Sequence, residues 1–196
     1  MRVGNRSEGG GKLEVVAPSF DRVFEVEYAP LRSYLYRRLG GSAADELAAE
    51  TFAIAYRRWD DLDLSRPVRP WLYGIAANLL RHHWRSERRM LRAYARAGLE
   101  PVCEQEDEAT VERTEAQIRK RALAAALADL RPIEREILLL HAWAELTDAE
   151  IAEALSQPLG TVKSRLHRAR ENMRNRLVSI GQLEVKALSA TIKEPR

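Results

Sequence analysis

The stretch LTDAEIAEALSQPLGTVKSRLHRAREN, residues 146–172, contains two helical segments separated by a short turn, SQP, at 156–158. Thr147, with Glu150 three positions later, has the spacing of a capping box at the start of the first helix. The proline that ends the turn cannot continue that helix, and the second helix begins near Gly160. The stretch therefore predicts a helix-turn-helix.

The second of these helices has one apolar face and one polar face. Four apolar residues, spaced by four, three and four positions, share one side of the helix: Val162, Leu166, Ala169 and Met173. At roughly 100° per residue, the residues on the opposite side are polar or charged: Ser164, His167, Arg168 and Glu171. Short polar groups beside cations suit a recognition helix in the DNA major groove. An ordinary helical hairpin with a solvated, charged face is the alternative.

The composition favours a helical protein with a polyanionic partner. The 196 residues are 45% hydrophobic and 31% charged, and Ala, Leu, Glu and Arg outnumber β-branched residues, which predicts an all-α fold. The net charge is only +3, but basic residues concentrate in 81–96 and 163–176, whereas acids concentrate in 100–115. Two basic segments indicate binding to a polyanion such as nucleic acid; solvated helix faces are the alternative.

Several functional classes find no support in the sequence. Cys103 is the only cysteine, so neither an intrachain disulfide nor a cysteine-based metal site can form. His82 and His83 point about 100° apart on a helix and have no evident third ligand, so we expect no metal and no cofactor. No catalytic motif is visible. Without an apolar run near the roughly 20 residues that cross a bilayer, and without a signal peptide, we expect a cytoplasmic protein with no membrane insertion.

The pattern along the chain predicts two small helical domains joined by a flexible linker. The expected divisions are a disordered N-terminal extension at 1–18, a helical domain at 19–97, an acidic linker at 98–116, a second helical domain at 117–180 and a tail at 181–196. The linker assignment rests on its acidic residues and its lack of large apolar side chains.

Residues 69–89, RPWLYGIAANLLRHHWRSERR, place aromatic side chains beside a series of arginines. Unstacked bases stack on aromatic rings while the phosphate backbone follows positive charge, so this pattern suits single-stranded nucleic acid. Asn78 could supply an amide that reads the edge of a flipped base. The alternative makes Trp71 and Tyr73 core residues and Asn78 a satisfied buried amide, and these residues alone slightly favour it.

Three motifs in series resemble the bacterial RNA polymerase sigma factors of the extracytoplasmic-function (ECF) group. DELAAETFAIAYRRW, residues 45–59, is similar to the family's core-binding stretch. Residues 69–85 resemble its promoter-melting helix, and residues 130–170 resemble its helix-turn-helix for the −35 element. The resemblance runs from about Phe20 to Leu177 with the motifs in the family's order. It implies that the two helical domains are sigma regions 2 and 4.

The resemblance also implies a role for individual residues. Four fall in the motif that docks on the β′ clamp helices of polymerase: Glu46, Leu47, Glu50 and Phe52. Six fall in the segment that binds −10 DNA, where Asn78 takes the position that reads a flipped base: Trp71, Tyr73, Ile75, Asn78, Arg81 and Arg85. At the −35 element, three positions face bases (Lys163, Ser164 and His167) and three contact phosphates (Thr161, Arg165 and Arg168).

Three positions depart from the family pattern. Ala49 stands where glutamine is common in the core-binding motif, and Ser156 replaces the usual glycine of the turn. Gly74 replaces a frequent arginine in the melting helix, where glycine weakens a helix by roughly 1 kcal/mol relative to alanine.

The resemblance implies an alternative sigma factor, which is a specificity subunit and not an enzyme. Its expected partners are core RNA polymerase, through the β′ clamp helices and the β flap, promoter DNA, and an anti-sigma factor. A free-standing helix-turn-helix regulator, whose N-terminal bundle senses a ligand or dimerises, is the competing hypothesis. It predicts duplex binding without polymerase, whereas a sigma factor binds tightly to core enzyme.

Overall fold

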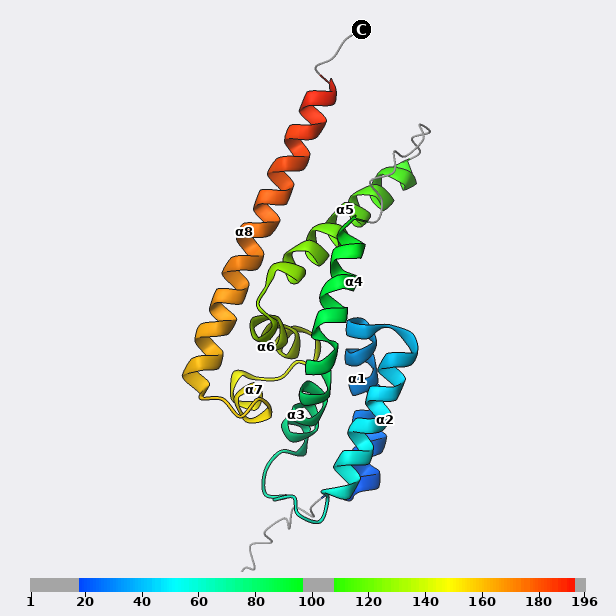
Figure 1. Cartoon of the computed structure of the whole chain (residues 1–196), viewed down its shortest axis with the longest axis vertical. Helices are drawn as coiled ribbons and strands as arrows, with labels where there is room; N and C mark the ends of the chain where they lie inside the picture. Colours follow the sequence, from blue (N-terminus) through cyan, green and yellow to red (C-terminus); the bar gives the residue numbers. More distant parts are fainter. Residues whose placement is uncertain (1–17, 97–107, 193–196) are drawn as a thin grey trace, which may run out of the picture.

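The computed structural model describes residues 18–96 and 108–192, with side chains described for 18–96 and 117–179, and every regular element in these ranges is helical (Figure 1). The elements are α1 (Phe20–Leu39), α2 (Gly41–Arg57), α3 (Val68–Leu80), the 3-10 turn η1 (Arg81–His83), α4 (Trp84–Arg96), α5 (Glu108–Asp129), α6 (Pro132–Trp143), α7 (Asp148–Ala154) and α8 (Leu159–Ile192). The predicted all-α class is confirmed.

Helices α1 and α2 form an antiparallel hairpin at the start of the described chain. The Ser19 side chain accepts a hydrogen bond from the backbone N–H of Arg22 and thereby caps α1. Gly40 takes a φ of 76°, in the left-handed region that favours glycine, and so lets the chain reverse directly into α2. Leu35 of α1 and Phe52 of α2 are buried in the shared core.

The aromatic and basic segment at 69–89 lies on three elements, α3, η1 and α4. Helix α3 starts at Val68, where the fixed φ of Pro67, −59°, suits the entry to a helix. The 3-10 turn at 81–83 separates the apolar α3 from the arginine-rich α4. The base-reading segment expected from the sequence therefore extends across two helices.

Parts of the predicted linker and tail are helical. Residues 97–107 lie outside the described residues, but α5 already begins at Glu108 and includes the end of the stretch expected as linker. Helix α8 likewise continues through the predicted tail as far as Ile192. The disordered extension expected at the N-terminus falls outside the described residues, apart from Pro18.

The predicted helix-turn-helix is α7 and the first part of α8. The expected capping box is confirmed: Thr147 Oγ1 accepts from Glu150 N at 3.3 Å, and Glu150 Oε2 accepts from Thr147 N at 2.8 Å. Ile151 packs in the core below it with no exposed surface. In the turn, Ser156 has a φ of 51°, which is a left-handed conformation at a non-glycine residue.

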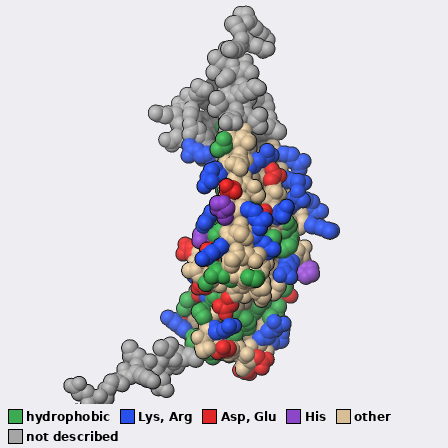
Figure 2. Space-filling view, turned by 90° about the vertical axis from the view of Figure 1, so that its left-hand side faces the viewer, with side chains coloured by type: hydrophobic (Ala, Val, Ile, Leu, Met, Phe, Trp, Pro, Cys, Tyr) green, Lys and Arg blue, Asp and Glu red, His purple; other side chains and the backbone are tan. Residues whose placement is uncertain are grey.

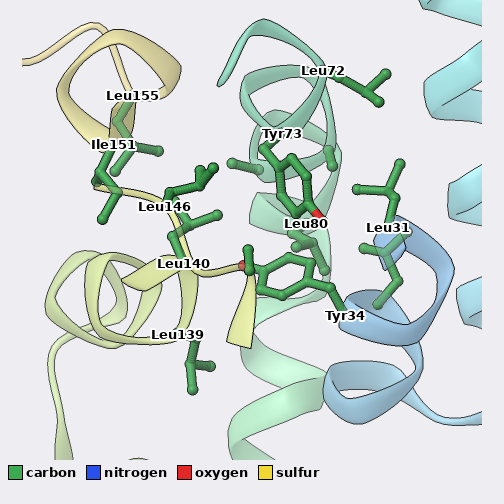
Figure 3. Packing of buried hydrophobic residues seen from close by; sticks show 14 of the residues in the cluster. Leu31, Tyr34, Leu72, Tyr73, Leu80, Leu139, Leu140, Leu146, Ile151 and Leu155 are labelled. Atoms are coloured by element: carbon green, nitrogen blue, oxygen red, sulfur yellow. The ribbon is translucent and has the colours of Figure 1, made fainter. Parts of the chain in front are cut away.

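The two halves of the molecule pack against each other around one apolar cluster. Helix α3 lies against α7, and Figure 3 shows Leu146 and Leu31 on either side of Tyr73. Arg69 on α3 donates from Nη2 to the carbonyl of Ala144, at the end of α6, at 2.8 Å. The helical bundle predicted for region 2 is therefore covered on one side by the helix-turn-helix.

At Gly74 the backbones of these two halves approach each other closely. A Cβ atom added there would lie 2.6 Å from the carbonyl oxygen of Ala154, on the backbone of α7. The departure from the family's arginine thus has a structural reason, because no larger side chain fits between α3 and α7 in this arrangement.

The strained turn gives a test of this description. Ser156→Gly should raise the free energy of unfolding by about 1 kcal/mol, because glycine relieves the left-handed strain. Ser156→Ala, which keeps a Cβ at the same φ, should bring no gain. Urea unfolding followed by circular dichroism measures both. Equal stability of the glycine and alanine variants would contradict the turn conformation.

Candidate nucleic-acid interface

Helix α8 presents the predicted recognition surface to solvent. Its apolar side is buried against α6 and α7: Val162 and Ala169 have no exposed surface and Leu166 is 2% exposed. The opposite side carries four exposed polar side chains, which we call the recognition surface: Lys163, Ser164, His167 and Arg168. The faces deduced from helical spacing are thus those of the folded protein.

Local contacts order part of the recognition surface. Ser164 Oγ donates to the carbonyl of Thr161 at 3.0 Å, and Arg168 Nε donates to the carbonyl of Ser164 at 3.3 Å. His167 Nε2 lies 3.6 Å from a carboxylate oxygen of Glu171 one turn further on. A hydroxyl, an imidazole and two cations therefore share one exposed face, as direct readout of base edges and phosphates requires.

Arg165 and Thr161, the other two residues predicted at the −35 element, are half-buried. The Arg165 guanidinium donates to the side-chain oxygen of Gln157 in the turn. This contact orients the arginine along the turn between α7 and α8. The Arg165 guanidinium is therefore less accessible to a phosphate than the guanidinium of the exposed Arg168. Their predicted contacts with DNA stay predictions.

Basic side chains also gather around the recognition surface. Figure 2, which views the side of the molecule that carries α8, shows many Lys and Arg side chains over this face. Exposed cations attract a polyanion over a distance of about 8–10 Å at moderate salt. The electrostatics of this side therefore suit a nucleic acid.

The residues predicted to bind −10 DNA fall into two groups. Asn78, Arg81 and Arg85 are exposed along the α3–α4 segment. In contrast, Tyr73 is 1% exposed, Ile75 is 7% exposed and Trp71 is half-buried. The first group is accessible to DNA in this arrangement, and Trp71 is partly accessible. Tyr73 occupies the core position that the alternative interpretation gave it, whereas Asn78 is exposed and is not the buried amide of that interpretation.

Tyr73 is held by a tyrosine of α1 and by an arginine of its own helix. Its ring packs edge-on against Tyr34 with centroids 5.5 Å apart, and the Arg69 guanidinium lies over it at 5.5 Å. Burial raises the pKa of the Tyr73 hydroxyl, against a smaller opposing effect of Arg69. The phenol therefore stays neutral and acts as a packed aromatic residue.

The residues predicted to dock on polymerase also divide by burial. Glu46 and Glu50 are exposed on α2, whereas Leu47 and Phe52 are 5% and 4% exposed and belong to the core. The two acids can meet a partner directly. In this arrangement the two apolar residues pack in the core and position the helix that presents the acids.

An aromatic groove beside these acids was not foreseen from the sequence. It is an open hollow of about 450 Å³ between α1 and α2, which we call the aromatic groove, and it is lined by Phe20, Phe24, Tyr28, Ala49, Phe52, Ala53 and Tyr56. Phe24 is 41% exposed and Tyr56 is 68% exposed. The aromatic residues at 20, 24 and 28 share one side of the helix, and this spacing could have indicated the groove. The same spacing is also found where a helix packs its apolar side into the core. Exposed aromatic surface next to charged residues is typical of a protein-binding site.

Other kinds of site are not seen in the described part of the chain. Among the side chains of residues 18–96 and 117–179, no three from His, Cys, Asp or Glu gather where they could hold a metal ion. No helix within residues 18–96 and 108–192 is both long enough and apolar enough to span a bilayer.

Comparison with known proteins places both halves of the chain in one family. Residues 23–90 match the family described as Sigma-70 region 2, and residues 120–173 match the family described as Sigma-70, region 4. The first match runs from within α1 into α4, and the second runs from within α5 into α8.

Relatives along most of the chain carry sigma-factor names. An RNA polymerase sigma-E factor of Streptomyces coelicolor is 31% identical over 153 residues, which cover 77% of this chain and 80% of that protein. The ECF RNA polymerase sigma factor SigW of Bacillus subtilis is 28% identical over 172 residues, covering 81% and 89%. The ECF RNA polymerase sigma factor SigL of Mycobacterium tuberculosis is 29% identical over 161 residues, with the same coverage of 81% and 89%.

Solved structures show the same fold. CnrH, in a complex with the cytosolic domain of CnrY, is similar with a TM-score of 0.58 at 23% identity, covering 82% of this chain and 88% of that one. The sigma factor RpoE of Bartonella quintana, in a complex with the anti-sigma factor NepR, is similar with a TM-score of 0.56 at 20% identity, covering 81% and 96%. With both sigma regions in order and relatives along most of its length, the chain belongs to the sigma-70 family of RNA polymerase sigma factors, in the ECF group.

Proposed function

We propose that this chain is an alternative sigma factor that binds core RNA polymerase and directs promoter-specific initiation by reading −35 duplex DNA and capturing melted −10 bases. The observation that carries the proposal is the presence of two separate polar surfaces in the two matched regions. Region 4 exposes the recognition surface on α8, and region 2 exposes Asn78, Arg81 and Arg85. Duplex reading and single-strand capture thus have separate sites on one chain.

The recognition surface supports duplex reading because it combines the two contacts that such reading needs. Lys163, Ser164 and His167 are proposed to meet base edges in the major groove, while Arg168 meets phosphate. Phosphate contacts orient the helix and supply most of the salt-dependent affinity. Specificity then rests on the side chains at the centre of the surface.

Capture of melted bases needs no chemical step by the sigma factor. A site that binds a base only after it leaves the stack lowers the free energy of the open duplex relative to the closed one. Asn78 offers an amide for hydrogen bonds to a base edge, and Arg81 and Arg85 follow the backbone. This role is that of a specificity subunit, with polymerase carrying out catalysis.

The proposed docking site for polymerase is the exposed face of α2 with the aromatic groove beside it. Glu46 and Glu50 supply charge for a basic partner, and Phe24 and Tyr56 supply exposed aromatic surface. We assign this site to the β′ clamp helices. Region 4 is assigned to the β flap. An anti-sigma factor is a further proposed partner, supported by the anti-sigma complex of the similar Bartonella protein.

Transcription with purified components tests the proposal. Core polymerase with and without this chain is given a genomic promoter library, and the transcripts are sequenced. We expect start sites that appear only when the chain is present and that share −35 and −10 sequences. Duplex binding by the chain alone, with no association with core enzyme in a pull-down, would instead favour the free-standing regulator.

Replacement of one recognition-surface residue should relax −35 specificity. Lys163→Ala removes a proposed base contact, so discrimination at one −35 position should fall by about 1–3 kcal/mol. Lys120→Ala is a matched control, because it removes the same charge from an exposed position on α5. The measurement is the −35 preference in the library transcripts. Equal preferences for the two variants would remove Lys163 from the reading site.

Replacement of the proposed base-reading amide should affect melting alone. Asn78→Ala is expected to lower open-complex yield roughly tenfold, because the captured base loses its hydrogen bonds, while −35 duplex binding is retained. Asn175→Ala, at an exposed position far along α8, is the control. Permanganate reactivity of unpaired thymines measures melting. An unchanged open-complex yield and −10 preference would show that Asn78 does not read a base.

A further inference from the structure

One acidic residue lies in the middle of the cationic side of α8. Between Leu159 and Ser179 this helix has six lysine and arginine residues and a single acid, Glu171. The proposed reading of the −35 element gives this carboxylate no role, and a negative charge opposes binding to a polyanion. Its presence on this side of the helix therefore calls for a physical reason.

Glu171 lies on the midline of the exposed face. At roughly 100° per residue it falls within about 20° of Ser164 around the helix axis, two turns further along α8. The buried side of the helix, with Val162 and Ala169, lies opposite. The Glu171 side chain is 53% exposed. A polyanion that lies flat on this face therefore meets the carboxylate.

Cations lie on both sides of this midline. Lys163, Arg170 and Arg174 are exposed and share one flank of α8, because they are spaced by seven and four positions. Arg168 is exposed on the other flank. A helix with its side chains is only about 10–12 Å across, so both flanks lie within the roughly 8–10 Å over which charges act at moderate salt. A phosphate held at either flank is therefore repelled by Glu171.

No arginine neutralises this carboxylate among the residues whose side chains the structure describes. Within that part of the chain its ionic contact is with His167, whose Nε2 lies 3.6 Å from Glu171 Oε2 and carries charge only when the imidazole is protonated. Arg168, less than one turn away, instead donates from Nε to the Ser164 carbonyl at 3.3 Å. The negative charge is thus free to act on a partner.

The position of Glu171 along α8 places it beyond the turns that enter a major groove. Recognition helices contact base edges with their N-terminal residues, and in α8 these residues form the recognition surface. Glu171 lies about 18 Å along the axis from the start of the helix at Leu159, whereas the major groove is about 8.5 Å deep. With the first turns in the groove, the carboxylate stays outside it and away from the base edges.

Two ways of meeting DNA consequently place this carboxylate differently. When α8 enters the groove by its N-terminal end, Glu171 remains outside. When the exposed face lies along the phosphate backbone, as in binding without sequence preference, the flank with Lys163, Arg170 and Arg174 contacts phosphates and Glu171 is brought against them. Repulsion between like charges then opposes the second arrangement and spares the first.

We propose that Glu171 is a specificity determinant that acts by repulsion, because its carboxylate weakens binding along the phosphate backbone without hindering the recognition surface in the −35 groove. The proposal rests on the proposed function, since it takes α8 as the reader of the −35 element. Specificity is a ratio of affinities, and a genome offers a large excess of competing sites. A lower affinity for those sites improves promoter choice with no added base contact.

Binding of the full-length chain to two duplexes tests the proposal. One duplex has a random sequence, and the other carries the −35 sequence shared by the transcripts that depend on this chain. Fluorescence anisotropy gives the affinity for each duplex over a series of salt concentrations. Glu171→Gln removes the charge while keeping the size and the helix propensity of the side chain. Thermal unfolding of the variant reports any effect on the fold.

Glu171→Gln should strengthen binding to the random duplex about eightfold near 0.1 M salt, because one further phosphate can then be neutralised, and the salt slope should steepen by about 0.9. Affinity for the −35 duplex should rise less than about twofold, so the ratio of the two affinities falls roughly fourfold. Glu25→Gln is the matched control, because Glu25 is also exposed, also pairs with a neighbour on its helix, and lies on α1, on the opposite side of the molecule from α8 (Figure 1). It should leave the ratio unchanged.

The other outcomes separate this role from competing ones. A random-duplex affinity of Glu171→Gln equal to that of Glu25→Gln, or an equal gain on both duplexes, would overturn the proposal. A lower unfolding temperature with both affinities unchanged would show that Glu171 only stabilises α8, and a weaker affinity for the −35 duplex would show that it contacts a base; either result also overturns the repulsion. Absence of transcripts that depend on the wild-type chain would overturn the proposed function, while the random duplex would still decide whether Glu171 repels the phosphate backbone.

Discussion

The arrangement of the whole molecule depends on the contact between two helix backbones at Gly74. The last turn of α7 lies so close to α3 that an added Cβ would fall 2.6 Å from the Ala154 carbonyl oxygen. This approach allows the apolar residues of both regions to merge into one cluster and brings the carboxylate of Glu136 to the Tyr34 and Arg38 side chains. With a side chain at position 74, the two regions would be held apart and each would have to cover its own apolar surface.

The cations of this chain have two different physical roles, which the small net charge conceals. Those on the exposed faces of α8 and α4 remain hydrated, cost little to maintain and attract a polyanion. Arg38 and Arg135 are buried, so they persist only with partners and determine which arrangement of the two regions is favoured. Binding and conformational preference are therefore assigned to separate sets of basic residues.

Helix α1 connects the proposed docking of polymerase with the contact between the regions. Its N-terminal half lines the aromatic groove with Phe20, Phe24 and Tyr28. In its C-terminal half, the Tyr34 and Arg38 side chains donate hydrogen bonds to the Glu136 carboxylate of α6. The groove is open in this arrangement, so one helix serves both an exposed aromatic surface and the packing of the two regions.

Local sequence determined much of this protein: the all-α class, the reversal at Gly40, the capping box of Thr147 and Glu150, and the polar face of α8 with Ser164, His167 and Arg168. Each of these follows from spacing or from one residue's backbone preference, and helical geometry is the same in every fold. Only the tertiary structure decided that Tyr73 and Ile75 are buried while Asn78 is exposed, and that Phe24 and Tyr56 border a groove. It also decided that Arg38 meets Glu87, which is 49 positions away in the sequence, and Glu136, which is 98 positions away. Such contacts depend on how distant helices pack, and no local pattern in the sequence records that packing.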